Sequence, residues 1–199
     1  DRTTAYTWDG WLCLSHRTTE EGSQTVTDRT YVHGLDLSGK LAGEGVDAMS
    51  TAGGIGGILA VKAADMIQCF TYDGNGNVMD LVDPVTGLVT AHYEYSPFGK
   101  TIVASGPLAE HNPYRFSTKE QDATSLLYYG YRYHSPSLGR WVNRDPIGRR
   151  GGANLYLVAG SDLVGSVDGH GLRWERVAGS SVYKAGADGD DLETLARMV

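Results

Sequence analysis

The oxygen-bearing side chains Asp73, Asn75 and Asn77 alternate along a short segment, as the first ligands of a calcium-binding loop do. The EF-hand pattern then requires a glycine and, six residues later, a glutamate, but the chain has Val78 and Pro84 there. The same segment carries Asp-Gly and Asn-Gly pairs, which favour the tight turn of a β-hairpin. We therefore interpret it as a turn and expect neither a metal ion nor a cofactor.

A glycine-rich apolar run extends from Ser50 to Val61. It lacks the Gly-Lys-Ser/Thr sequence with which a phosphate-binding loop holds a nucleotide. It is also too short to span a membrane, and Lys62 and Asp65 end it. The run predicts a tight, buried loop that leads into a strand.

Cys13 and Cys69 are far apart in the chain, and no CxxC motif is present. Two cysteines cannot form a metal site alone. They could pair in an oxidising compartment, but two buried free thiols are the favoured interpretation. A standalone hydrolase is disfavoured, because the sequence has no Ser-His-Asp motif, HExxH motif or other cluster of metal ligands.

The composition of the 199 residues points to a β-rich protein, with 27 glycines and 12 tyrosines. Glycine together with tyrosine, threonine and valine is typical of many short strands joined by tight turns. The formal net charge of −7 argues against a groove for nucleic acid, which requires clustered lysine and arginine. No segment is long and apolar enough to predict a membrane span.

Local patterns predict where the strands lie. Alternating aromatic residues before a glycine indicate strand pieces within residues 1–37, and hairpins are expected across residues 69–99. Along Leu127–Tyr133, alternation would place Tyr129, Tyr131 and Tyr133 on one face of a strand. Only the end of the chain predicts a helix, a short one over Asp191–Met198.

The run from Thr71 to Leu172 resembles the RHS repeat-associated core domain, and residues 1–70 resemble preceding YD-type repeats. The segments that carry the resemblance occur in order along the chain. They are Tyr72–Val78, Tyr93–Gly99, Tyr114–Lys119, Leu127–Tyr133, Gly139–Gly148, Gly151–Tyr156 and the closing Asp168-Gly-His-Gly-Leu172. This family includes bacterial RHS toxins and the C components of insecticidal toxin complexes.

The resemblance implies an all-β fold, in which strands and hairpins form a strip that spirals into a hollow shell, with a short C-terminal helix. It divides the chain into a repeat segment (1–70), the core domain (71–172) and the start of a variable C-terminal region (173–199). It also implies a secreted or cell-surface protein. Because the chain begins at Asp1 without a basic and then apolar start, any secretion signal is expected upstream.

The resemblance further implies self-cleavage of the Leu172–Arg173 peptide bond by Asp145 and Asp168, with Arg132 as a third site residue. One carboxyl of such a pair acts as base on water and the other as acid, because neighbouring like charges split their pKa values. A guanidinium could orient a carboxylate or stabilise the developing oxyanion. The scissile bond would lie four residues after Asp168, so the reaction would be intramolecular.

Each site residue also has a structural interpretation. Asp145 before Pro146 and Asp168 before Gly169 could simply form turns, and Arg132 could be a cation–π strut among tyrosines. Nearby substitutes for the site residues are Asp162, Arg144 and His170, of which His170 is expected to be a solvated turn residue. The sequence departs from the family pattern at Arg149, Gly169 and Ser161–Leu163.

Two functions of different classes remain open. The first is a self-processing shell whose partners are its own C-terminal cargo polypeptide, upstream YD repeats and proteins of secretion or toxin complexes. The second is a YD-repeat module that does not cleave itself and serves extracellular interaction or adhesion. Neither function involves nucleic acid.

Overall fold

The computed structural model describes residues 2–20, 26–43, 51–172 and 174–176 of the chain. These residues form antiparallel β-structure and three short 3₁₀ turns, η2 (Phe116–Thr118), η3 (Gly148–Gly151) and η4 (Ala159–Ser161). None of the helices in these ranges has the length and apolar character needed to cross a membrane. The many short strands expected from the glycine and tyrosine content, and the all-β class that the resemblance implies, are therefore confirmed.

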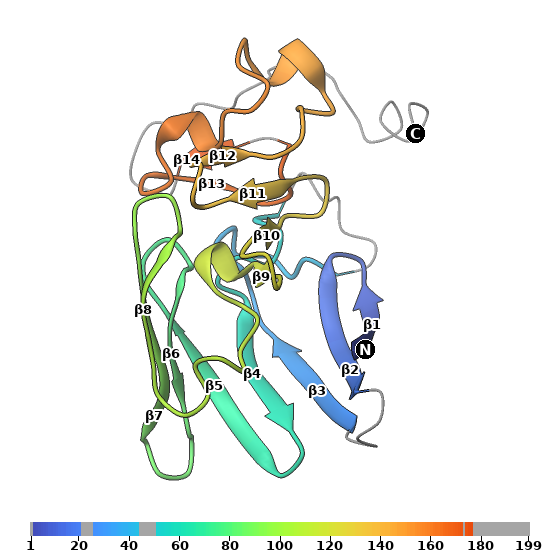
Figure 1. Ribbon diagram of the computed structural model, residues 1–199, viewed down its shortest axis with the longest axis vertical. Coiled ribbons are helices and arrows are strands. Elements are labelled where there is room, and N and C mark those ends of the chain that lie inside the picture. Colours follow the sequence, from blue (N-terminus) through green and yellow to red (C-terminus); the bar gives the residue numbers. More distant parts are fainter. Residues whose placement is uncertain (1, 21–25, 44–50, 173, 177–199) are drawn as a thin grey trace.

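Eight strands form one large sheet in which each strand pairs with its neighbour in sequence. In order they are β1 (Arg2–Asp9), β2 (Leu12–Glu20), β3 (Val26–His33), β4 (Ile58–Ala63), β5 (Met66–Tyr72), β6 (Val78–Val82), β7 (Val89–Tyr95) and β8 (Thr101–Ser105). All the pairings are antiparallel, so the sheet is a continuous meander (Figure 1). The strands expected within 1–37 and the hairpins expected within 69–99 are confirmed.

Two smaller sheets, coloured yellow to orange in Figure 1, lie at one end of the large sheet. One has the order β12-β11-β10-β9 and the other pairs β13 with β14. Their strands are β9 (Glu120–Gln121), β10 (Leu127–Tyr128), β11 (Tyr133–Ser135), β12 (Arg140–Trp141), β13 (Ser166–Asp168) and β14 (Trp174–Arg176). These short strands are joined by long turns, and the residues with candidate chemistry lie among them.

Aromatic residues dominate the core. On β7, Ala91 and Tyr93 are both fully buried while the residues between and beside them are more exposed, which is the period-two pattern of a sheet with one covered face. Arg115 lies over the Tyr93 ring with its guanidinium carbon 4.3 Å from the ring centroid. A second cluster, at the end with the small sheets, is built around Trp141 and Tyr129. Trp141 and Tyr129 of this cluster lie against the candidate site.

The glycine-rich run folds as expected into a buried loop before β4. Ile55 and Ile58 are 0% and 2% exposed. The loop is held from both sides, because Gly54 N–H donates to the Asp36 carboxylate (3.1 Å) and Gly56 N–H donates to the Thr118 hydroxyl (2.8 Å). We call residues 51–57 the glycine loop.

The segment after β5 is a hairpin turn, as predicted. The Asp73 carboxylate accepts hydrogen bonds from the backbone N–H groups of Asn75 and Asn77, both 2.9 Å long. The Asn77 amide also donates to Asp73 over 2.8 Å. Both carboxylate oxygens of Asp73 are therefore used to close the turn, and Asn77 Oδ1 accepts a hydrogen bond from Ser117 N–H.

The expected strand over Leu127–Tyr133 is wrong. Gly130 has a φ of +96°, so the chain turns there, and Tyr128 of β10 faces Tyr133 of β11 across the resulting pair of strands. Tyr129 is 2% exposed, whereas Tyr131 and Tyr133 are more than one third exposed, so the three tyrosines do not share a face. Because glycine adopts a positive φ readily, the chain turns at Gly130 despite the alternating pattern of the sequence.

Cys13 and Cys69 are free thiols on β2 and β5. Two strands separate β2 from β5 in the sheet, which explains why the thiols do not pair. Cys13 is buried, as expected, but Cys69 is only half-buried.

The proposed division of the chain stays a prediction. Its first boundary, 70/71, falls inside β5, and its second, 172/173, falls between β13 and β14. The predicted helix over Asp191–Met198 lies outside the described residues.

Candidate functional site

Arg132 lies in the connection between β10 and β11 and is 3% exposed. Its Nη1 atom is 2.9 Å from Oδ2 of Asp145, and its Nη2 atom is 3.5 Å from Oδ2 of Asp168. Its Nε donates a hydrogen bond to the Gly171 carbonyl. The guanidinium carbon also lies 4.3 Å from the centroid of the Trp141 ring. One guanidinium thus joins both predicted acids to the predicted cleavage segment, and its cation–π contact coexists with these charge contacts.

Asp145 follows β12 and starts a turn, as its position before proline indicated. Its Oδ1 accepts a hydrogen bond from Ile147 N–H (3.0 Å), and its carbonyl accepts one from Gly148 N–H (3.0 Å). Burial raises the pKa of the Asp145 carboxyl, and Arg132 opposes that rise. The turn and the ion pair use different oxygens, so one interpretation does not exclude the other.

Asp168 ends β13 and is 2% exposed. Its Oδ1 accepts hydrogen bonds from the N–H groups of Gly171 (2.7 Å) and Leu172 (3.1 Å). Burial raises the pKa of Asp168 to about 6, although Arg132, these two N–H groups and Lys119 act in the opposite direction. The carboxyl therefore changes its protonation state near neutral pH.

The two carboxyls do not share a proton directly, as a pair of adjoining acids would. Each contacts a different nitrogen of Arg132, and no hydrogen bond joins Asp145 to Asp168 in the described structure. Both carboxyls close turns through Oδ1, but their burial differs, because Asp168 is fully buried and Asp145 is only half-buried. Such differences give two carboxyls separate acid and base roles.

The residues after Asp168 fold back toward Arg132. Gly171 has a φ of +75°, and a Cβ atom there would lie 3.2 Å from Tyr129 Cβ and 3.3 Å from Arg132 Cβ. Leu172 is 2% exposed. We call residues 168–172 the cleavage turn; Arg173, on the other side of the predicted scissile bond, lies outside the described residues.

His170 is not the solvated turn residue that was expected. It is 5% exposed, and its ring meets Trp11 edge-on with 4.8 Å between centroids. Burial, followed by the nearby Lys119, lowers the pKa of His170 to about 3, so the imidazole is neutral. The burial of His170 could not be predicted from the local sequence, because Trp11 lies in the turn between β1 and β2, far from His170 along the chain. The other suggested substitutes, Asp162 and Arg144, are exposed.

Lys119 is a site residue that carries no local signal in the sequence beyond its place in a family motif. Its ammonium group donates to the carbonyls of Gly169 (2.6 Å) and Gly53 (2.8 Å). Lys119 is 8% exposed, and burial lowers its pKa to about 8. A buried cation therefore sits against the cleavage turn.

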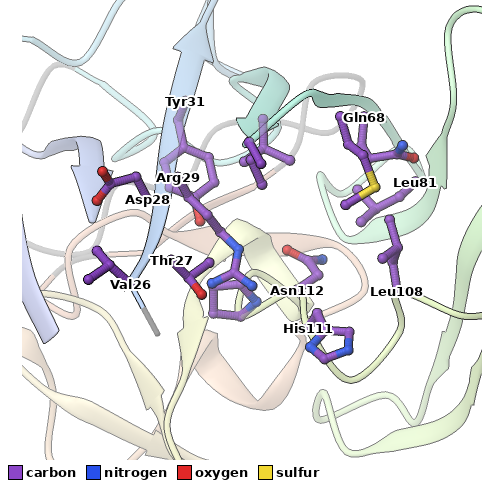
Figure 2. Close-up of a pocket in the computed structure, with 15 residues that line it drawn as sticks. Val26, Thr27, Asp28, Arg29, Tyr31, Gln68, Leu81, Leu108, His111 and Asn112 are labelled. Atoms are coloured by element: carbon purple, nitrogen blue, oxygen red, sulfur yellow. The ribbon is translucent and has the colours of Figure 1, made fainter. Parts of the chain in front are cut away.

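Arg132, Asp145 and Asp168 do not line the cavity shown in Figure 2, whose volume is about 590 Å³. Residues of β3 lie on one side of it, and Leu108, His111 and Asn112 lie on another (Figure 2). Its acid, Asp28, is exposed and pairs with Arg17 over 2.7 Å. Nor do the described ranges hold any group of three or more histidine, cysteine, aspartate or glutamate residues placed to bind a metal ion.

No family model matches this chain. Among curated proteins, it is 40% identical over 89 residues to the toxin subunit YenC2 of Yersinia entomophaga, which covers 43% of the chain and 9% of that protein. It is 32% identical over 174 residues to the double-stranded DNA deaminase toxin A of Burkholderia cenocepacia, covering 85% of the chain and 12% of that protein. The chain thus spans about a tenth of the length of these relatives.

The solved structure of the complex TcdB2-TccC3-Cdc42 has a similar fold. The TM-score is 0.63 at 24% identity, and the alignment covers 86% of this chain and 8% of that one. The sheet order, the all-β composition and the relatives agree with the resemblance drawn from the motifs. The chain belongs to the RHS/YD-repeat proteins, of the type found in bacterial RHS toxins and the C components of insecticidal toxin complexes.

Proposed function

We propose that this chain is the C-terminal part of an RHS shell that encloses a cargo polypeptide and releases it by cleaving itself after Leu172. The relatives support a toxin-associated shell, since they include toxin subunits and a toxin. The observation that carries the cleavage step is the convergence on Arg132 of Asp145, Asp168 and the Gly171 carbonyl.

The environments of the two acids suggest their roles. Asp168 has a pKa of about 6 and is enclosed, so it is the better proton donor near neutral pH. Asp145 lies against Arg132 and is the base. Water attacks the carbonyl carbon of Leu172 and gives a proton to Asp145. Asp168 protonates the departing nitrogen of Arg173 as the C–N bond breaks, which leaves a carboxylic acid at Leu172 and an amine at Arg173. Asp145 then holds the proton taken from water, and Asp168 is a carboxylate.

Arg132 would orient the segment next to the scissile bond and stabilise the negative charge that develops on the attacked carbonyl. Its hydrogen bond to the Gly171 carbonyl holds the residue next to the scissile bond, and its two other nitrogens face the acids. A positive charge in a buried site favours the oxyanion that forms on the attacked carbonyl. Because substrate and catalytic groups belong to one chain, the reaction runs once and gains the advantage of fixed proximity.

Mass spectrometry of the expressed full-length protein tests this proposal. We expect a break after Leu172 in the wild type, and an intact chain in Asp145→Asn and Asp168→Asn. Asp162→Asn is the matched control, because Asp162 is an exposed turn residue whose Oδ1 accepts a hydrogen bond from Gly165 N–H (2.9 Å). It should be cleaved like the wild type.

An intact wild-type protein would refute self-cleavage and favour the YD-repeat interaction module that does not cleave itself. In that case the contacts of Arg132 would be structural, as its stacking on Trp141 allows. Cleavage that continues at the same bond in both acid variants would refute the assignment of the acids.

We further propose that the partners are the C-terminal cargo, upstream YD repeats and other toxin-complex proteins, and that the whole protein is secreted or displayed at the cell surface. The toxin-subunit relatives support this. Fractionation of the producing cells tests it: a full-length protein that is found only in the cytoplasm of a secretion-competent strain would contradict the location.

A further inference from the structure

We propose that Lys119 is a positioning residue for self-cleavage, because its ammonium group ties the glycine loop to the cleavage turn and places a positive charge beside Asp168. This inference rests on the proposed function. It adds to the proposed site the glycine loop, which packs against the cleavage turn. It also predicts that the glycine loop, which precedes the core-domain motifs in sequence, belongs to the functional site.

The ammonium group of Lys119 is held by main-chain carbonyls. Its Nζ donates to two main-chain carbonyls, Gly53 of the glycine loop and Gly169 of the cleavage turn, and lies 5.3 Å from the centroid of the Tyr129 ring. In the described part of the chain no carboxylate lies within ion-pair distance of it. A buried charge without an ionic partner costs stability, so a purely structural position would be filled more easily by an apolar residue.

The backbones that Lys119 joins are in direct contact. A Cβ atom added to Gly53 would lie 2.1 Å from the Gly169 carbonyl oxygen, and one added to Gly169 would lie 2.7 Å from the Ala52 carbonyl carbon. The glycine loop is itself anchored by Asp36 and Thr118, the residue before Lys119. The residue that follows Asp168 is therefore seated on a loop that is fixed on both sides.

The charge of Lys119 also reaches the acid. The charged groups that face Asp168 are Arg132 and Lys119, and those that face Lys119 are Asp168 and Asp36. His170, the remaining titratable neighbour besides the Tyr129 phenol, is neutral because its pKa is about 3. Lys119 lowers the pKa of Asp168. Without the ammonium group, that pKa would rise further.

The test compares three variants of the full-length protein, Lys119→Arg, Lys119→Gln and Lys119→Met. Lys62→Met is the control, because Lys62 is exposed on β4. We expect Lys119→Met to slow cleavage after Leu172 by about 10- to 100-fold, since small misplacements in an intramolecular reaction have effects of this size. The control should be cleaved at the wild-type rate. Resistance to added protease shows whether each variant is folded.

The pH profile separates positioning from a merely structural role. Uncleaved precursor of each Lys119 variant is purified and incubated between pH 5 and 9, and the loss of intact chain is followed by mass spectrometry. With Asp168 as donor, the rate falls as pH rises through its pKa. This fall should occur at higher pH in Lys119→Gln and Lys119→Met than in Lys119→Arg, which keeps the charge.

Three results would overturn the proposal. One is wild-type cleavage rates in all Lys119 variants, and another is slow cleavage with superimposable pH profiles. If Lys119→Met is degraded as an unfolded chain, the cleavage rates and pH profiles of Lys119→Gln and Lys119→Arg provide the test. The third is a wild-type protein that stays intact, which would refute the proposed function as well. If cleavage is lost in Asp168→Asn but not in the Lys119 variants, only the inference about Lys119 is refuted.

Discussion

Replacing Gly53 by alanine disturbs the cleavage turn directly without replacing a charged residue. The added Cβ atom would lie 2.1 Å from the Gly169 carbonyl oxygen and 2.6 Å from its carbon. Ordinary contacts between such atoms are about 3.5 Å long, so the two backbones must separate by roughly 1 Å. That displacement moves the residue next to Asp168, and a shift of about 1 Å near reacting groups can slow a reaction about 100-fold.

Alanine at position 53 also has a second, local cost, because Gly53 has a φ of +62°. A residue with a side chain loses about 1–2 kcal/mol in this left-handed conformation. Gly87→Ala separates the two effects: Gly87 has a φ of +72°, but nothing lies within 4 Å of its added Cβ atom. Gly87→Ala should therefore lose stability and keep its cleavage rate.

The assay is pulse labelling of the full-length protein, followed by quenching and measurement of the fraction cleaved after Leu172. We expect uncleaved precursor to persist about 100 times longer in Gly53→Ala than in the wild type. Equal rates in Gly53→Ala, Gly87→Ala and the wild type, with all three chains folded, would refute the idea that the glycine loop positions the cleavage turn.

Two further predictions concern the protonation of Asp168 and the hydrogen bond between Asn77 and Ser117. The purified Gly53→Ala precursor should cleave progressively more slowly above about pH 6, because the pKa of Asp168 is raised to about 6 and the donor loses its proton as pH rises through that value; a rate that increases from pH 6 to 8 would contradict the donor role. Asn77→Ala should destabilise the protein by about 1–3 kcal/mol in thermal unfolding, since the buried Ser117 N–H loses its acceptor, Asn77 Oδ1, at 2.7 Å. Asn143→Ala, at an exposed position, should unfold like the wild type.

The meander could be predicted because its causes are local. On β7 the alternation of buried and exposed residues is visible in the sequence, and the turn after β5 is closed by Asp73 bonding residues two and four positions away. Antiparallel neighbours joined by such turns need no distant information. The same rule failed at Leu127–Tyr133, where Gly130 turns the chain and Tyr129 packs edge-on against Trp141 with 5.0 Å between centroids.

The site could be predicted only in part, because its residues meet through long-range contacts. Arg132, Asp145 and Asp168 were identified from their motifs, and the structure brings them together, while their catalytic roles stay predictions. The residues near His170 in sequence do not predict its contact with Trp11, which buries it. Lys119 likewise meets Gly53 and Gly169, two residues that no local pattern connects.

Several contacts that hold the cleavage turn are made to its main chain. Arg132 Nε bonds the Gly171 carbonyl, Lys119 bonds the Gly169 carbonyl, and Asp168 Oδ1 accepts the N–H groups of Gly171 and Leu172. These partners are main-chain atoms, but the turn is also held through two of its side chains, since the His170 ring packs on Trp11 and Asp168 Oδ2 faces Arg132 Nη2. The position of the turn therefore depends both on its backbone path and on the residue types at 168 and 170.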